Sequence, residues 1–308
     1  MDNRQITLTG PGVSGTVVNA SVLRDLLVLA IEGSQRALRM RLEGRSTSRG
    51  TPPPWLEPAA DFEVEVREGS TVLDLTIPTL AEAYPAEFGQ RQLFTEVDPD
   101  DTAFDYFAEA LAAAAQRSDS QLYDRSMLQF FGKLRTVFEH GIDSIQLSTG
   151  RQSTPIYIVR ESLSAFRDLE QSIPSPQYVQ LAGKLDEIRH SDRAFSLKVG
   201  DGSHIKGVAD KTQLDELHKN WGAAVVVAGT CHFTPAGRVL RIDAETIRTA
   251  EERDTRLWSV IPEPLFSERE PLLLGSHQGP RSGLNAIVGR WPGNESDEDI
   301  AAALNELS

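Results

Sequence analysis

The sequence predicts an α+β protein, because helical and strand-like hydrophobic patterns alternate along it and neither dominates. Three observations divide the chain. Before the proline break Pro174-Ser175-Pro176, the apolar residues follow helical spacing in some segments and strand spacing in others. The next 70 or so residues consist mainly of short strand-like runs. The remainder of the chain contains several separate prolines. The predicted parts are an N-terminal α+β domain with a helical segment (1–174), a small β-barrel domain (175–248), and an extended C-terminal tail ending in a short helix (249–308).

The first 90 residues read as a small α+β unit. Ile6-Thr7-Leu8 predicts a strand that ends at Gly10-Pro11-Gly12. A helix is expected from the N-cap Ser21 to Gly44, since its apolar residues fall mostly on one face. The alternating runs 62–66 and 72–77 then predict a hairpin.

Arginines gather on the polar side of that first helix and just beyond its end. Two interpretations are open: a strip that faces phosphate, or a solvated helix face with cations near the negative helix end. The residues concerned are Arg24, Arg36, Arg39, Arg41, Arg45 and Arg49.

Residues 100–173 are predicted to be mainly helical. The expected helices are 101–115, 122–139 and 161–171, with a short strand at 144–148. Phenylalanines recur through these elements, and we expect them to fill a core without any cofactor: Phe104, Phe107, Phe130, Phe131, Phe138 and Phe166.

Residues 177–248 carry the signature of a small barrel. The predicted strands are 178–188, 194–199, 203–208, 224–233 and 238–246, with one helix at 212–219. Five strands with a helix before the fourth favour a closed or partly open barrel, of the size of oligonucleotide-binding and related barrels. Such an architecture does not by itself imply a function.

The C-terminal segment predicts a capped amphipathic helix that starts at about Asp297. Ser296 is a suitable N-cap, and Asp299 lies where a reciprocal capping acid belongs. One apolar stripe then follows at helical spacing, formed by Ile300, Ala303, Leu304 and Leu307. A helix this short needs a partner surface, either on its own domain or on another molecule.

Composition narrows the function classes. The chain has 308 residues, 40% of them apolar and 25% charged, as is ordinary for a globular protein. We expect a cytoplasmic protein with no membrane segment, because the first residues lack a signal pattern and no long apolar window occurs. The single cysteine, Cys231, agrees with a reducing compartment.

Charge is acidic overall but unevenly spread. A net charge of −14 argues against capture of nucleic acid by the whole surface. Residues 175–248, however, hold ten bases against nine acids, whereas 249–308 hold five bases against eleven acids. The near-neutral middle segment is therefore the place to look for a separate partner.

The chain lacks the familiar catalytic motifs, and we expect it not to be an enzyme and to need no catalytic residue, metal or cofactor. No G-x-S-x-G elbow or phosphate loop occurs. Metal-ligating residue types fall within the barrel segment, but without ligand spacing, and neighbours on a strand would point to opposite faces. These residues are His190, His204, His218, Cys231 and His232.

The end of the chain resembles the C-terminus of bacterial antitoxin-like proteins that are paired with PIN-domain ribonuclease toxins. The residues that carry the resemblance are Gly289-Arg290-Trp291-Pro292-Gly293-Asn294-Glu295-Ser296-Asp297-Glu298-Asp299-Ile300 and the leucines after them. The resemblance covers about 284–308. It implies a tail that lies along a toxin and occludes a metal-dependent, acidic active site, with Arg290 paired to those acids.

Two hypotheses follow. The leading one is a non-enzymatic, antitoxin-like protein that restrains a toxin or effector, such as a small ribonuclease, through its tail. The tail residues concerned are Arg290, Trp291, Pro292, Ile300, Ala303, Leu304 and Leu307. The alternative is a nucleic-acid-binding or sensing protein that uses the barrel: Lys184, Arg189, Arg193, Lys198, Lys206 and Trp221, with Phe195 and Phe233 as further stacking platforms.

Overall fold

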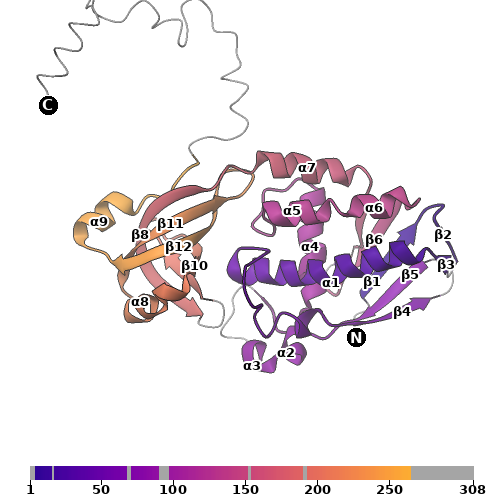
Figure 1. Ribbon diagram of the computed structural model, residues 1–308, viewed down its shortest axis with the longest axis horizontal. Coiled ribbons are helices and arrows are strands. Elements are labelled where there is room, and N and C mark those ends of the chain that lie inside the picture. Colours follow the sequence, from indigo (N-terminus) through magenta and orange to yellow (C-terminus); the bar gives the residue numbers. More distant parts are fainter. Residues whose placement is uncertain are drawn as a thin grey trace, which may run out of the picture. The chain divides into compact units, whose positions relative to one another are not determined.

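The computed structural model describes residues 4–15, 17–67, 71–89, 97–151, 154–189 and 193–264, all within the compact unit Met1–Glu268. These residues confirm the α+β class and the closed barrel (Figure 1). They form one hydrophobic cluster between Ile6 and Ile173 and another between Leu181 and Ile247. The predicted tail helix lies outside the described residues.

The first cluster contains a five-stranded antiparallel sheet in the order β4-β5-β1-β6-β7. In its centre, Ile6 lies opposite Leu73 on one side and Leu147 on the other, so the strands share one apolar face. The strands are β1 (Arg4–Thr9), β4 (Glu63–Arg67), β5 (Thr71–Thr76), β6 (Ser144–Ser148) and β7 (Ile156–Val159); β2 (Val13–Ser14) and β3 (Val17–Val18) form a separate small hairpin.

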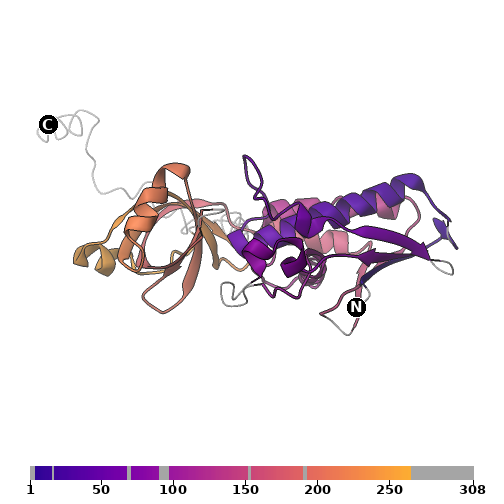
Figure 2. The same ribbon diagram turned by 90° about the horizontal axis from the view of Figure 1, so that it is seen from below.

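Helices pack against the apolar face of this sheet (Figure 2). The longest, α1, is capped by the side chain of Asn19, which accepts a hydrogen bond from the backbone of Ser21 at 2.9 Å, so the predicted Ser21 cap is wrong by two positions. The elements are α1 (Ala20–Glu43), η1 (Pro58–Ala60), α2 (Leu80–Ala83), α3 (Pro85–Phe88), α4 (Ala103–Ala115), α5 (Arg125–Phe131), α6 (Leu134–Glu139) and α7 (Ser162–Ser172).

The helix predicted at 122–139 is two helices, because α5 ends at Phe131, with Gly132 as its C-cap, and α6 begins at Leu134. All six phenylalanines predicted for the core are buried, and several form tilted ring pairs, for example Phe107 with Phe131 and Phe131 with Phe166.

The second cluster is a closed barrel in the order β10-β12-β11-β8-β9, and its strands form a ring in Figure 2. Its elements are β8 (Gln177–Arg189), β9 (Ala194–Lys198), β10 (His204–Ala209), η2 (Lys211–Gln213), α8 (Leu214–Lys219), β11 (Ala224–Phe233) and β12 (Val239–Thr249). Strands β10 and β12 are parallel and all other neighbours are antiparallel. With a helix between the third and fourth strands, this is the oligonucleotide/oligosaccharide-binding (OB) topology.

After the barrel comes α9 (Glu252–Trp258), which the sequence analysis did not predict and which contacts β8 and β11. Within the described ranges no helix combines the length and the apolar character needed to cross a membrane.

Candidate anion-binding groove

The C-terminal end of α1 meets the outer face of the barrel. Three barrel bases donate hydrogen bonds to carbonyl oxygens at this helix end: Arg189 Nη2 to Leu42 at 2.6 Å, Lys206 Nζ to Arg41 at 2.7 Å, and Arg241 Nη1 to Gly44 at 3.0 Å. Carbonyls of the last turn have no partner inside a helix and carry its negative dipole end. The bases therefore satisfy both the hydrogen bonds and the charge of the helix end.

The chain turns sharply where α1 ends, and the following loop is fixed in place. Gly44 adopts the left-handed conformation with φ 69°, and an added Cβ would lie 3.2 Å from the Cβ of Arg241. The backbone and hydroxyl of Ser46 then donate to the carboxylate of Asp124 at 2.9 and 2.6 Å. Asp124 also caps α5, so one carboxylate ties the loop to that helix.

A cavity of about 480 Å³, which we call the arginine groove, lies between this loop and the barrel. It is lined by Arg45, Thr47, Ser48, Arg49, Arg193, Arg241 and Asp243. Four arginines and one carboxylate thus line the groove. The chain as a whole is acidic, so this concentration of positive charge is local.

The four arginines differ in what they bind. Arg241 donates to Gly44 and Asp243, and Arg45 donates through Nε to the buried carboxylate of Glu43 at 2.6 Å. The guanidinium groups of Arg49 and Arg193 form no hydrogen bond or ion pair with any other residue that the structure describes. Two of the four are therefore available to an anionic ligand.

Asp243 organises the barrel side of the groove. It accepts hydrogen bonds from Arg241 Nε at 2.9 Å and from a ring nitrogen of His232 at 2.9 Å. Burial disfavours the charged carboxylate, but the hydrogen bond from His232 and the charge and hydrogen bond of Arg241 outweigh it, and the pKa of Asp243 falls well below its usual range. Asp243 thus stays ionised and holds Arg241 in position.

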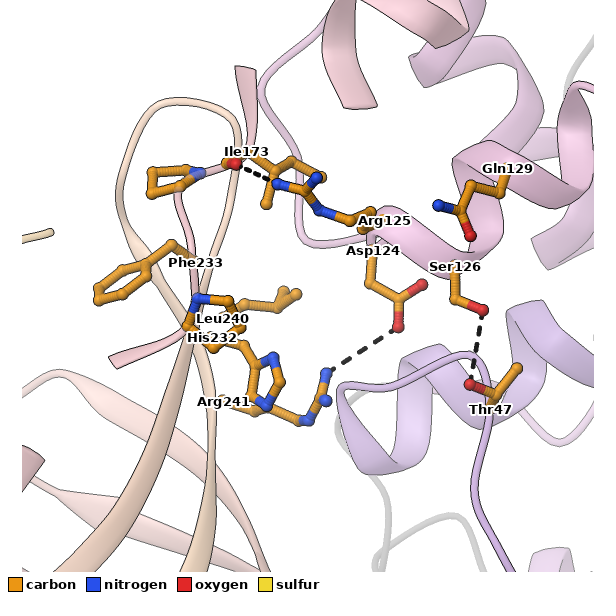
Figure 3. Close-up of a pocket in the computed structure, with 12 residues that line it drawn as sticks. Thr47, Asp124, Arg125, Ser126, Gln129, Ile173, His232, Phe233, Leu240 and Arg241 are labelled. Carbon is orange, nitrogen blue, oxygen red and sulfur yellow. Dashed lines mark hydrogen bonds and ion pairs between the residues drawn. The ribbon is translucent and has the colours of Figure 1, made fainter. Parts of the chain in front are cut away.

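A second cavity of about 290 Å³ adjoins the groove and shares Thr47 and Arg241 with it. Figure 3 shows Asp124 and Arg241 approaching each other across it, at 3.9 Å. Phe233 and Leu240 line it from the barrel, Ile173 lines it from the end of α7, and Gln129 and Ser126 contribute polar groups from α5. The pair of cavities therefore offers a charged part and a mixed apolar part.

The six residues predicted for nucleic-acid binding do not form one surface. Arg189 and Lys206 are engaged by α1, and Arg193 lines the groove. Lys184 and Lys198 are exposed cross-strand neighbours nearer the other end of the β8–β9 pair. Trp221 is 71% exposed and donates to the carbonyl of Asp186 at 3.3 Å.

Several other candidate residues have structural partners instead. Of the α1 arginines, Arg24, Arg39 and Arg41 pair with Asp25, Glu43 and Glu109, while Arg36 stacks on Phe130. Phe195 and Phe233, the other proposed stacking platforms, are buried in the barrel core, so that role is wrong for both. Their apolar rings are needed inside a small barrel.

Cys231 and His232 point to opposite sides of β11, as expected for strand neighbours. Burial raises the pKa of the Cys231 thiol to about 12, which makes it a poor nucleophile near neutral pH. Among the described residues, no three His, Cys, Asp or Glu side chains are grouped so that they could hold a metal ion.

The role of Arg241 and Asp243 was not predicted from the sequence. A signal was present, because Arg241 and Asp243 alternate with the apolar Ile242 and Ala244 on one strand and must face outward if those two residues fill the barrel core. The residues predicted for the docking tail, from Arg290 to Leu307, lie outside the described residues. No protein-family profile, curated protein or solved structure matches this chain.

Proposed function

We propose that this protein binds single-stranded nucleic acid at the arginine groove. The observation that carries the proposal is the convergence of four arginines on one cavity, two of them, Arg49 and Arg193, without a partner among the described residues. Arginine suits phosphate because its planar guanidinium donates two parallel hydrogen bonds to phosphate oxygens.

The position of the groove on the barrel supports the same ligand. OB barrels bind oligonucleotides across their second and third strands, together with the loops between strands one and two and between strands four and five. Here Arg193 directly precedes the second strand, and Phe233 and Leu240 flank the connection from β11 to β12. The basic groove therefore lies at the edge where this fold binds its ligands.

Charge distribution favours a single strand over a duplex. Binding to a duplex surface needs many cations spread over an extended face, whereas this chain has a net charge of −14 and the arginine groove is confined to a few residues. A flexible single strand can bring one or a few phosphates into such a cavity.

Salt-dependent binding of the full-length protein tests the proposal. An internally labelled 12-nucleotide strand, phosphorylated at both ends, is titrated by fluorescence anisotropy between about 25 and 200 mM salt. If the two arginines without a described partner, Arg49 and Arg193, contact phosphate, they contribute about −1.4 to the slope of log K against log salt, since single strands give about −0.7 per contact. Replacing Arg49 and Arg193 by alanine should reduce the slope by about 1.4.

A charge-matched control separates the groove from general electrostatics. Arg253 and Arg256 are exposed on α9 and do not line the groove. Their double alanine variant changes the net charge equally and should leave the slope almost unchanged. Absence of binding at about 25 mM salt would exclude the proposal, and equal losses in both double variants would exclude the groove as its site.

The docking function predicted for the tail remains a second, separate proposal that rests on the sequence pattern alone. It expects one protein to co-purify with the full chain and to be lost from a chain ending at Gly283. The paired substitutions Ile300→Asp and Leu304→Asp should cause the same loss if the apolar stripe is the contact. Recovery of the same proteins by all three forms would contradict it.

A further inference from the structure

We infer that the arginine groove is a site for a terminal phosphate, so that the protein recognises the phosphorylated end of a strand. The inference rests on the proposed function and makes it more specific. A terminal phosphomonoester differs from an internal phosphodiester in charge and in hydrogen-bonding capacity. It carries a charge of roughly −1.5 to −2 near pH 7 and three acceptor oxygens, against one charge per internal phosphate.

The groove has the composition that such a dianion requires. Its guanidinium groups come from three separate segments: the loop after α1, the turn before β9, and strand β12. The hydroxyls of Thr47 and Ser48 also line it, and they donate to Ser126 Oγ at 3.5 Å and to the carbonyl of Arg49 at 3.2 Å. Asp243 is the one carboxylate in its lining, and Glu43 pairs with Arg45 from outside it. Donors that converge from several sides on one cavity match a group with several oxygens at one point.

The basic residues elsewhere on the barrel do not continue the groove into a track. A strand read through its internal phosphates needs cations spaced along its path. Arg189 and Lys206, which would carry the path along the outer face, donate instead to the last carbonyls of α1. Lys184 and Lys198 are therefore separated from the groove by bases that are already engaged.

The neighbouring cavity provides a place for the terminal nucleoside. It adjoins the groove through Thr47 and Arg241, and its apolar lining includes Leu240 of β12 and Ile173 at the end of α7. Together the two cavities fall within the range of about 300–1,000 Å³ that is typical of small-ligand sites. A phosphate held by the arginines would thus place its own nucleoside beside an apolar wall (Figure 3).

The backbone at Arg193 supports a role beyond folding. Arg193 has φ 62°, a left-handed conformation that side-chain-bearing residues rarely adopt and that glycine adopts freely. Unfavourable conformations of this kind concentrate at ligand sites. Arg193→Gly therefore removes the guanidinium group without imposing strain, and it separates loss of the site from loss of the fold.

The test compares three oligonucleotides of one sequence with the full-length protein: one with a 5′-phosphate, one with a 3′-phosphate, and one with hydroxyls at both ends. We expect one phosphorylated form to bind at least about tenfold tighter than the hydroxyl form, as an added charged interaction can provide. In the Arg49→Ala and Arg193→Gly double variant that ratio should fall to about one, while the Arg253→Ala and Arg256→Ala control keeps it.

The alternative outcomes are distinct. Equal affinity of the wild-type protein for all three strands would overturn terminal recognition and leave the proposed function intact. No binding of any strand at low salt would overturn both. A preference that survives in the groove double variant would place the terminal phosphate elsewhere and overturn the inference. Competition by inorganic phosphate against the phosphorylated strand alone would support it further.

Discussion

Two groups of bases lie near the same side of the barrel, and they differ in whether another residue of the protein accepts their hydrogen bonds. Arg189, Lys206 and Arg241 donate to carbonyls at the end of α1, whereas Arg49 and Arg193 have no partner among the described residues. The first group stabilises the junction between helix and barrel. The second leaves positive charge exposed to a groove. A basic residue on this surface therefore indicates a ligand site only when the protein has not already supplied its partner.

The largest effect on this comparison is expected from Arg241→Leu. The variant removes hydrogen bonds to Gly44 and Asp243 at a side chain that is only 9% exposed. Hydrogen bonds of charged groups contribute about 1.5–3 kcal/mol each, and unpaired partners remain behind, so we expect the free energy of unfolding to fall by about 3 kcal/mol.

Urea denaturation measures this loss, and Arg49→Leu is its matched control. Arg49 is exposed and has no described partner, so its substitution should change stability by no more than about 0.5 kcal/mol. Similar losses in the two variants would remove the distinction between the two groups of bases.

A second test replaces the glycine on which the junction turns. Gly44→Ala places a side chain in the left-handed region and brings its Cβ to 3.2 Å from the Cβ of Arg241. Left-handed backbone costs an L residue about 1–2 kcal/mol, and the crowding adds to it, so we expect a loss of about 2 kcal/mol in chemical denaturation. Gly15→Ala, at φ 59° with open space around it, should lose only the backbone part.

Much of this fold could be predicted from local patterns. The β-branched runs and turn glycines predicted all five barrel strands, and the single apolar face of α1 predicted its length. The division of 122–139 at Gly132 was missed because apolar spacing continues across the break. The short strand β7 was also missed, since four residues give too little alternation to recognise.

The groove could not be predicted in the same way, because it is assembled from distant segments. Arg45 and Arg49 were recognised as possible phosphate ligands and Arg193 as a barrel base, but they are far apart in sequence. Closure of the barrel through the parallel pair β10 and β12 decides which loops meet α1. The sequences of β10 and β12 do not by themselves specify that these two strands pair.

The pH dependence of stability tests the contribution of Asp243, which holds Arg241 at the junction side of the groove. Its folded pKa lies below the unfolded value, so the folded protein binds this proton less readily than the unfolded chain. The stabilisation is therefore present above about pH 4, the usual range of an unfolded aspartate, and is lost as pH falls toward the folded pKa.

The stability difference between the wild-type protein and Asp243→Asn isolates this contribution from other carboxylates. We expect the difference to be constant near neutral pH and to shrink steadily below about pH 4. Thermal denaturation of both proteins over this range measures it. A difference that does not depend on pH would show that Asp243 contributes through shape and hydrogen bonding alone.

The smallest change in the free energy of unfolding is expected from Arg193→Gly, and the sign of that change is the informative result. Relief of left-handed strain gains about 1–2 kcal/mol, while the added freedom of glycine in the unfolded chain costs about 0.5–1 kcal/mol. We therefore expect a small net gain in stability, measured as a slightly higher denaturation midpoint. A loss would mean that the arginine takes part in folding, as Arg241 does. A gain accompanied by weaker phosphate binding would mean that the chain keeps an unfavourable residue because the groove uses its charge.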